Sequence, residues 1–354
     1  MDINYSILSI VHGAFGSNNG ITVIPTTRKE PHMPSTVLIL GAAGRLGQVL
    51  ATAFADAGWQ VRAQARKTLP AALAQRPRVQ AVRCEATDTA ALIAAAEGAS
   101  VIVNALNPLY TEWDRLALPL ADAALAAARA SGALLMLPGN VYNFGRELPP
   151  LLTPTTKECG DTPKARIRIE MEARLAAAAT EGVDSVVIRA GDFFGGPGTG
   201  SWFDMALASK IDEGRFIYPG NPTLAHAWAY LPDLAQVFVR VAAQRATLRG
   251  HHRLHFTGHT LSGEAFRAAS EAVVGRALRA ASLPWWLIRL AAPFVPMWRE
   301  MLVMRYLWER PHALDDAALR ELIGSVPHTS LPHALHAAFT DIKLPLAAKA
   351  MTLA

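Results

Sequence analysis

The segment Thr36-Val-Leu-Ile-Leu-Gly41-Ala-Ala-Gly44-Arg-Leu-Gly47 has the pattern of a strand, a glycine turn and the start of a helix. In such turns the first glycine makes the turn, the second allows a diphosphate to approach, and the third lets the helix pack closely. The N–H groups that begin the helix attract phosphates. The alternative is a structural turn without a ligand. We expect a dinucleotide site made by Gly41, Ala43, Gly44, Arg45, Leu46 and Gly47.

The composition is that of a globular protein. The chain has 354 residues, of which 51% are apolar and 18% charged, with a net charge of +5. Its arginines are scattered, which favours anionic small ligands such as nucleotides over nucleic acid. The only cysteines, Cys84 and Cys159, form no metal-ligand pattern and indicate a reducing compartment, so we expect a cytoplasmic protein.

The two ends of the chain differ from its middle. Residues 1–33 are expected to form a flexible arm, 34–195 a nucleotide-binding domain, and 196–354 a smaller, mostly helical substrate lobe partly interleaved with it. No run of about 18 apolar residues occurs, so no membrane span is expected. The nearest run, 283–298, contains Arg289 and three prolines and is interpreted as buried or interfacial helices.

Strand and helix patterns alternate from residue 36 to about residue 195. After the first strand, further strands are expected at 60–65, 79–83, 100–104, 133–137 and 183–189. This alternation predicts an α/β fold with a doubly wound parallel sheet of the Rossmann type. Beyond residue 195 the rhythm is expected to stop, with a helix at 231–243, a short strand at 253–256 and terminal helices at 315–323 and 331–339.

The end of the second expected strand bears on cofactor choice. NAD enzymes of this architecture commonly carry an acidic residue there, which binds the ribose 2′-hydroxyl. Here the strand end has no acid and is followed by Arg66. With Arg45, Arg66 is suited to a 2′-phosphate, so NADP is favoured over NAD. The alternative is that both arginines are solvated.

Further candidates follow the third and fourth expected strands. Asp88 is placed either to meet the adenine or to cap the next helix. The strand ending near residue 104 should face the cofactor, because ligands lie at the carboxyl ends of parallel strands. Tyr110 and Trp113 would be loop-packing aromatics or part of a substrate wall. The residues expected at the cofactor here are Ala105, Leu106 and Asn107.

These motifs, with the segments 138–145 and 189–195, resemble an extended short-chain dehydrogenase/reductase. More narrowly, the chain resembles the atypical, epimerase/dehydratase-like and NmrA-like members. The resemblance covers roughly residues 36–243 in order and implies the Rossmann fold, an NAD(P) cofactor, and a homodimer as a reasonable expectation. It is much less specific for the reaction.

Typical members use a Ser/Thr and a Tyr-x-x-x-Lys pair, and all three are replaced here. Lys164 stands at the tyrosine position, Arg168 at the lysine position and Asn140 at the Ser/Thr position. The segment is similar to that of isoflavone-reductase-like members, in which a lysine replaces the tyrosine as acid/base. Thr162 is expected to cap this helix and Pro163 to begin it. The alternative is a solvated Lys164, with Arg168 paired to Glu172.

Two further sets of residues are candidates for the chemistry. Tyr142 would replace the missing tyrosine if its phenol faces the nicotinamide, or it would be buried by alternation along the loop. Asp192 and His226 would form either an acid/base set beside Phe193 in the substrate lobe or a structural hydrogen bond. The histidines between residues 251 and 259 form no metal pattern, and no metal is expected.

The sequence therefore predicts an NADP-dependent oxidoreductase or epimerase/dehydratase-like enzyme. Its substrate would be a small carbonyl or hydroxyl compound or a sugar nucleotide. The replaced catalytic residues leave open a second hypothesis, a non-catalytic NADP-binding redox sensor like NmrA-like proteins.

Overall fold

The computed structural model describes residues 35–344 and 346. The arm expected at residues 1–33 lies outside the described residues. Within them, no helix is both long and apolar enough to cross a membrane.

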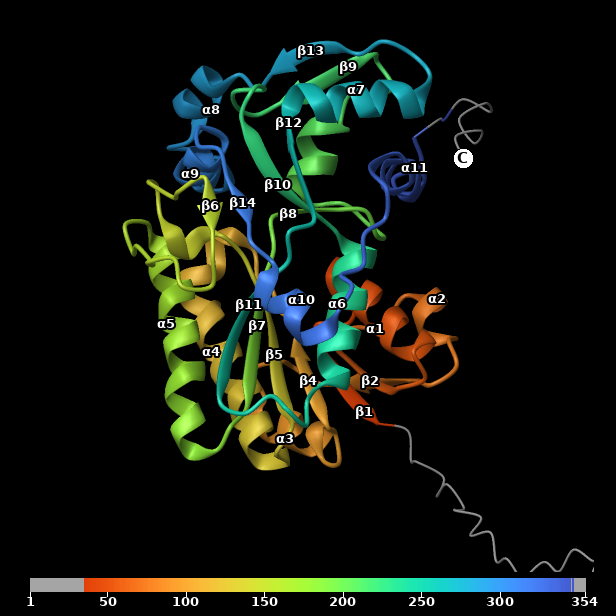
Figure 1. Cartoon of the computed structure of the whole chain (residues 1–354), viewed down its shortest axis with the longest axis vertical. Helices are drawn as coiled ribbons and strands as arrows, with labels where there is room; N and C mark the ends of the chain where they lie inside the picture. The colour runs from red at the N-terminus through yellow and green to blue at the C-terminus, as the bar shows by residue number, and fades with distance from the viewer. Residues whose placement is uncertain (1–34, 345, 347–354) are drawn as a thin grey trace, which may run out of the picture. The chain divides into compact units, whose positions relative to one another are not determined.

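A seven-stranded parallel sheet forms the centre of the fold (Figure 1). Its strand order is β11-β7-β5-β4-β1-β2-β3, so the chain winds outward in both directions from β1 and β4. The point between these two strands is where ligands bind in doubly wound sheets. The strands are β1 (Thr36–Leu40), β2 (Gln60–Ala65), β3 (Val79–Arg83), β4 (Val101–Asn104), β5 (Leu134–Gly139), β7 (Ser185–Arg189) and β11 (His251–His255).

Helices cover both faces of this sheet (Figure 1). Side chains on a strand alternate between faces. Thus Leu38 and Leu40 of β1 join the core beneath α3 (Thr89–Ala96), α4 (Trp113–Ser131) and α5 (Pro163–Ala178). Val37 and Ile39 join the opposite core, which is covered by α1 (Arg45–Asp56) and α6 (Leu231–Ala243). The doubly wound Rossmann fold expected from the sequence is confirmed.

Many of the remaining elements build onto the carboxyl-terminal edge of the sheet (Figure 1). β10 (Ala225–Tyr230) pairs with β8 (Asp192–Phe194) and β12 (His259–Ser262). The core here is aromatic: Trp228 packs against Phe266 and Trp308. The other elements are η1 (Tyr110–Glu112), η2 (Tyr142–Phe144), η3 (Ala179–Glu181), η4 (Phe203–Leu207), η5 (Arg305–Trp308), β6 (Leu151–Leu152), β9 (Arg215–Tyr218), β13 (Arg279–Ser282), β14 (Ala313–Leu314), α2 (Ala71–Ala74), α7 (Gly263–Val274), α8 (Trp285–Ala291), α9 (Pro296–Met304), α10 (Ala317–Ile323) and α11 (Leu331–Asp341).

The expectation that the strand–helix rhythm stops at residue 195 is wrong in one respect. After α6 the chain returns to the main sheet as β11, which pairs in parallel with β7. The segment His251-His-Arg-Leu-His255 hides this strand because it has one apolar residue. Two of its histidines each have one hydrogen-bond partner: His251 Nδ1 lies 2.9 Å from Ser185 Oγ, and His255 Nδ1 lies 3.0 Å from the carbonyl oxygen of Leu152.

Candidate functional site

The glycine turn has the shape that phosphate binding requires. Gly41 adopts φ +75°, and Gly44 precedes α1 without any side-chain cap. A Cβ at Gly47 would lie 2.2 Å from the carbonyl oxygen of Gly41, so only glycine lets α1 approach this closely. The first N–H groups of α1, around Leu46, therefore remain available to an anion next to Ala43. This cradle fits a dinucleotide diphosphate.

The loop after β4 lies against this turn. A Cβ at Gly41 would be 3.2 Å from both the Ala105 carbonyl oxygen and the Leu106 side chain. The Leu106 N–H donates to Asn104 Oδ1 at 3.3 Å, which holds the loop at the strand end. Asn107 follows and is exposed. The structure thus brings the expected residues 105–106 to the glycine turn.

The guanidinium of Arg45 is held by the chain itself. It donates to Asp204 Oδ1 at 2.6 Å, to Ser201 Oγ at 3.0 Å and to the Gly195 carbonyl oxygen at 2.9 Å. Its Nη2 atom is buried and has no hydrogen-bond partner among the described residues. Arg45 therefore ties the glycine turn to the segment after β8, and only Nη2 is left for a further ligand.

The carboxyl end of β2 is as expected, and it also carries a residue that fixes the glycine turn. Arg66 follows β2 and is exposed, with a small residue, Ala65, before it. Gln64, which sequence reasoning missed, accepts from the Gly41 N–H at 2.9 Å and donates to the Cys84 carbonyl oxygen at 2.7 Å. Its buried amide thereby fixes the turn to the sheet.

Asp88 caps helix α3, which is one of the two roles expected for it. Its Oδ1 atom accepts a hydrogen bond from the N–H of Ala91 at 3.0 Å, so the side chain caps α3. The carboxylate is exposed, and this bond satisfies an N–H of the first helical turn. A contact between Asp88 and an adenine stays a prediction.

An aromatic cluster lies at the ends of β4 and β5. The phenol oxygens of Tyr110 and Tyr142 are 2.6 Å apart, and the Trp113 ring packs on both side chains. Burial raises the pKa of Tyr110 to about 12 and the pKa of Tyr142 well above its ordinary value. The negative charge of Asp192 adds to both shifts, so both phenols are neutral at physiological pH.

Lys164 is brought into this cluster from the first turn of α5. As expected, Thr162 caps the helix by accepting from the Ala165 N–H at 3.1 Å, and Pro163 begins it. The Lys164 side chain is only 3% exposed, and its Nζ lies 4.9 Å from the centre of the Tyr110 ring. The alternative of a solvated surface lysine is therefore wrong.

The ammonium of Lys164 has two polar partners. It donates to the Tyr110 carbonyl oxygen at 3.3 Å and forms an ion pair with Glu300 of α9. Sequence reasoning missed Glu300, because nothing in its local pattern points to a residue 136 positions earlier. The ion pair compensates the burial of the ammonium and places its Nζ atom beside the Tyr110 ring.

Arg168 and Asn140 lie near the same cluster, but their side chains make hydrogen bonds to backbone groups. Arg168 stacks on Trp113, with its guanidinium 4.9 Å from the ring centre, and donates to the Pro138 carbonyl oxygen at 3.2 Å. Burial lowers the pKa of Arg168. Asn140 Oδ1 accepts from the Tyr142 N–H at 3.1 Å, closing the turn after β5.

Glu172 is not the ion-pair partner of Arg168, contrary to the alternative weighed above. Its fully buried carboxylate is paired with Arg189 at 2.6 Å and also accepts from Asn143 at 3.0 Å. Burial is the main cause of a raised pKa at Glu172, partly offset by Arg189. This network connects α5 to β7 below the aromatic cluster.

Asp192 and His226 are paired, but Phe193 faces elsewhere. His226 Nε2 lies 2.8 Å from Asp192 Oδ2, and its ring stacks on Trp308 at 4.4 Å. Phe193 packs against the core under α1 and α6, on the opposite side of the strand. The pair agrees with both earlier hypotheses, an acid/base set and a structural hydrogen bond.

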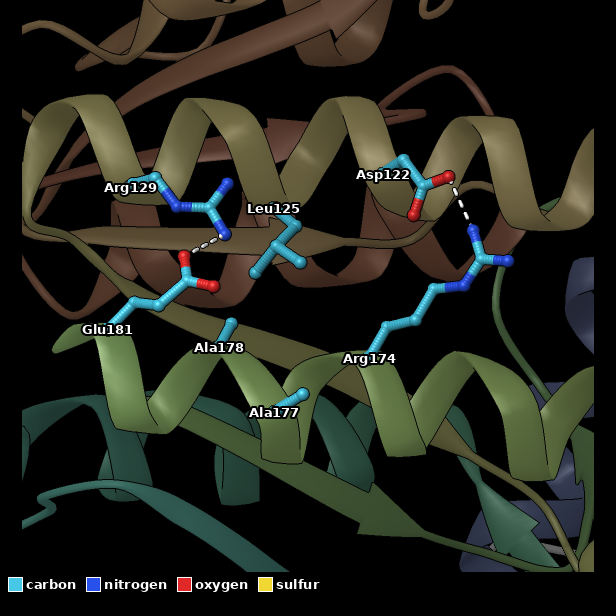
Figure 2. Close-up of a pocket in the computed structure, with 7 residues that line it drawn as sticks. All are labelled: Asp122, Leu125, Arg129, Arg174, Ala177, Ala178 and Glu181. Atoms are coloured by element: carbon cyan, nitrogen blue, oxygen red, sulfur yellow. Dashed lines mark hydrogen bonds and ion pairs between the residues drawn. The ribbon is translucent and has the colours of Figure 1, made fainter.

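A separate groove runs between α4 and α5 on their outer surface (Figure 2). Figure 2 shows Arg174 pairing with Asp122 across it, and Arg129 pairing with Glu181, both at 2.6 Å. Leu125, Ala177 and Ala178 form its floor. None of the predicted site residues lines this groove, so it is distinct from the candidate site.

Together, the glycine cradle at the switch point and the aromatic cluster beyond it define a Rossmann-type fold with a candidate dinucleotide site. The model of the NmrA-like family matches residues 33–129. No curated protein matches the chain significantly in sequence.

Solved structures with the same fold include two UDP-glucose 4-epimerases. UDP-glucose 4-epimerase from Brucella ovis, in complex with NAD, has a TM-score of 0.71 and 17% identity, covering 88% of this chain and 100% of that one. UDP-glucose 4-epimerase from Bifidobacterium longum, in complex with NAD+ and UDP, has a TM-score of 0.71 and 15% identity, covering 87% and 98%. The resemblance to atypical, epimerase/dehydratase-like and NmrA-like proteins is confirmed.

Proposed function

We propose that the protein is an NADP-dependent oxidoreductase or epimerase/dehydratase-like enzyme of the atypical short-chain type. The observation that carries this proposal is the burial of Lys164. An ammonium that is 3% exposed, inside an aromatic cluster at the carboxyl ends of β4 and β5, is costly unless it has a use or a partner. Here the partner, Glu300, comes from the other part of the chain, as expected where a substrate lobe closes over a cofactor site.

The proposed chemistry divides between the cofactor and the chain. The nicotinamide would supply or accept a hydride. Lys164 would give a proton to the substrate oxygen, or take one from it, and Glu300 would stabilise the ammonium between turnovers. One O–H group of the Tyr110–Tyr142 pair is used between the two phenols, and the other would donate a hydrogen bond that orients the substrate. Arg168 and Asn140 would keep the loop after β5 in place.

Residues 34–195 would thus hold the cofactor, and residues 196–354 would complete the substrate side. Asp192 and His226 lie at this junction and would contact the part of the substrate that does not react. A small carbonyl or hydroxyl compound is favoured over a sugar nucleotide because the Tyr-x-x-x-Lys pair is replaced. The structural relatives named above act on UDP-sugars, so sugar nucleotides belong in the test.

NADP is proposed over NAD because of the residues at the carboxyl end of β2. An acidic residue that would bind a ribose 2′-hydroxyl is absent, and the exposed Arg66 is free to meet a 2′-phosphate. Arg45 would contribute less than expected, because Asp204 already holds its guanidinium. The relatives in complex with NAD are the reason to measure both cofactors.

A second candidate function is a non-catalytic NADP-binding sensor. It is favoured by the replacement of all three standard catalytic residues and by the NmrA-like match over residues 33–129. Such a protein would keep the glycine cradle and would bind NADPH without turning over any substrate.

The test has two measurements. Calorimetry would give the dissociation constants of NADPH and NADH, and NADPH oxidation would be followed with carbonyl compounds and UDP-sugars. Turnover that is lost in Lys164→Met, with NADPH binding preserved, supports the enzyme. Tight NADPH binding without turnover of any compound supports the sensor instead. Turnover that survives Lys164→Met would shift the proton transfer to Tyr142.

A further inference from the structure

The segment around α8 exposes an unusual amount of apolar surface. Phe294 is 86% exposed, Trp286 71% and Leu290 68%, while Leu287 and Met297 are also exposed. These five residues, which we call the α8–α9 face, lie within twelve consecutive positions. Single exposed apolar residues are ordinary, but a contiguous patch with two large aromatic rings marks a binding surface.

The exposure follows from how α8 packs. Residues three or four apart share one face of a helix. Ile288 is buried and Trp285 is half-buried, and the Trp285 indole donates to the Pro219 carbonyl oxygen at 2.6 Å. This face anchors α8 to the protein, so Trp286 and Leu290 on the other face have nothing beneath them. The helix is apolar on both sides, but only one side is covered.

The sequence interval that carries this face is rich in arginine, and the carboxylate that ends it, Glu300 of α9, is already paired with Lys164. No aspartate or glutamate occurs between Glu271 and Glu300, whereas Arg276, Arg279, Arg289 and Arg299 all fall in this interval. These four arginines are exposed. None of them forms an ion pair with a carboxylate of the described residues, while the flanking arginines are paired, Arg267 with Glu271 and Arg305 with Glu309.

Elements α8 and α9 lie next to each other at the margin of the molecule (Figure 1). They have 7 and 9 residues, far fewer than the roughly 20 that a membrane-crossing helix needs. Segments that lie in the membrane interface expose tryptophan, phenylalanine and leucine side chains together with basic residues, whatever their length. Tryptophan prefers that interface, where its ring is half in hydrocarbon.

We propose that the α8–α9 face docks the protein on the surface of a membrane containing anionic lipids. Trp286, Leu290 and Phe294 would insert among the acyl chains near the headgroups, and Arg289 and Arg299 would contact the lipid phosphates. A second copy of the chain fits less well. A two-fold interface would set the same arginine-rich segment against itself, and its one carboxylate, Glu300, is already paired with Lys164.

This proposal does not depend on the proposed reaction. Full-length protein would be sedimented with vesicles of phosphatidylcholine alone, and with vesicles holding about 30% phosphatidylglycerol. We expect binding to the anionic vesicles, weakened when salt is raised from about 0.1 M to about 0.5 M. The double variant Trp286→Ser/Phe294→Ser should bind at least about tenfold more weakly. Because both side chains are exposed, its melting temperature should be unchanged.

The matched control is Met205→Ser, which removes an apolar side chain that is 61% exposed elsewhere. It should bind vesicles like the wild type. The proposal is overturned if wild type binds neither kind of vesicle, or if the double variant binds as well as wild type. It is also overturned if sedimentation equilibrium shows a wild-type dimer that the double variant abolishes while vesicles are not bound.

Discussion

The phenol oxygens of Tyr110 and Tyr142 are 2.6 Å apart at the end of β5, and neither phenol ionises near neutral pH, because burial raises the pKa of both. A phenol that stays neutral at this pH can make hydrogen bonds, but it is not available in the ionised form that acts as a base. The only buried cation whose side chain reaches both Tyr110 and the carboxylate of Glu300 is Lys164, within the described residues. Proton transfer in the proposed enzyme is therefore assigned to the lysine.

Replacement of Lys164 should be far more damaging than replacement of Tyr142. We expect Lys164→Met to lower kcat by about 10²–10⁴-fold, the usual contribution of a positioned acid or base. Tyr142→Phe keeps the ring and loses one hydrogen bond, so a loss below about tenfold is expected. Rates would be measured with the carbonyl compound that the wild type reduces fastest. Lys157→Met, at an exposed lysine, is the control and should keep the wild-type kcat. A larger loss of kcat for Tyr142→Phe than for Lys164→Met would contradict the assignment.

Cofactor selectivity should depend on Arg66. Removing a guanidinium that contacts a phosphate dianion costs one or two charge-assisted hydrogen bonds. We expect Arg66→Ala to weaken NADPH binding by about tenfold or more and to leave NADH binding nearly unchanged. Calorimetric titrations of both cofactors would check this. Arg249→Ala, at an arginine 75% exposed before β11, should change neither constant. Equal losses for the two cofactors would show that Arg66 does not read the 2′-phosphate.

Local sequence patterns were sufficient to predict most strands of the nucleotide-binding sheet. The expected strands 60–65 and 79–83 and helix 231–243 match the bounds of β2, β3 and α6. Helix α6, for example, has strong apolar periodicity and a proline, Pro232, in its first turn, which are local signals. The Thr162 cap is local too. The polar edge strand β11 lacks such a signal, so it appeared only as a short strand without a place in the sheet.

The candidate site was predicted less completely, because its contacts join distant segments. Lys164 was found by its position in α5, but its partner Glu300 is 136 residues away. Likewise, the link between Arg45 and Asp204 spans 159 residues, and it removes most of the freedom that Arg45 was expected to have. Pairings of this kind depend on how the second part of the chain folds back, which periodicity does not encode.

Because α1 packs closely on the glycine turn, adding a single methyl group at Gly47 should strongly lower both stability and dinucleotide binding. In Gly47→Ala the new Cβ would lie 2.2 Å from the Gly41 carbonyl oxygen, so the backbone must move. We expect a loss of about 2–3 kcal/mol in the free energy of unfolding and loss of dinucleotide binding. Urea unfolding and calorimetry would measure the two effects. In Gly160→Ala the Cβ would be 3.2 Å from the flexible Arg166 side chain, so this control should stay within about 1 kcal/mol of wild type.

Three buried histidines predict that stability falls on mild acidification. Burial lowers the pKa of His312 to about 3 and the pKa values of His255 and His259 to about 4. In the unfolded chain a histidine titrates near pH 6.5, at about its ordinary pKa. Between these values the unfolded state binds more protons than the folded state. The contribution to stability is therefore complete above about pH 6.5 and is lost as the pH falls towards the folded pKa values.

The slope of this loss gives the test. Each histidine contributes up to about 1.4 kcal/mol per pH unit below pH 6.5. Urea unfolding at about pH 7.5, 6.5 and 5.5 should show a nearly constant free energy of unfolding over the first interval and a clear decrease over the second. In His312→Gln the free energy of unfolding should fall less between about pH 6.5 and 5.5, by about the contribution of one histidine. In His333→Gln, at an exposed position, it should fall as in wild type. A free energy that stays flat down to about pH 5.5 would contradict the assignment of these three rings as neutral and buried.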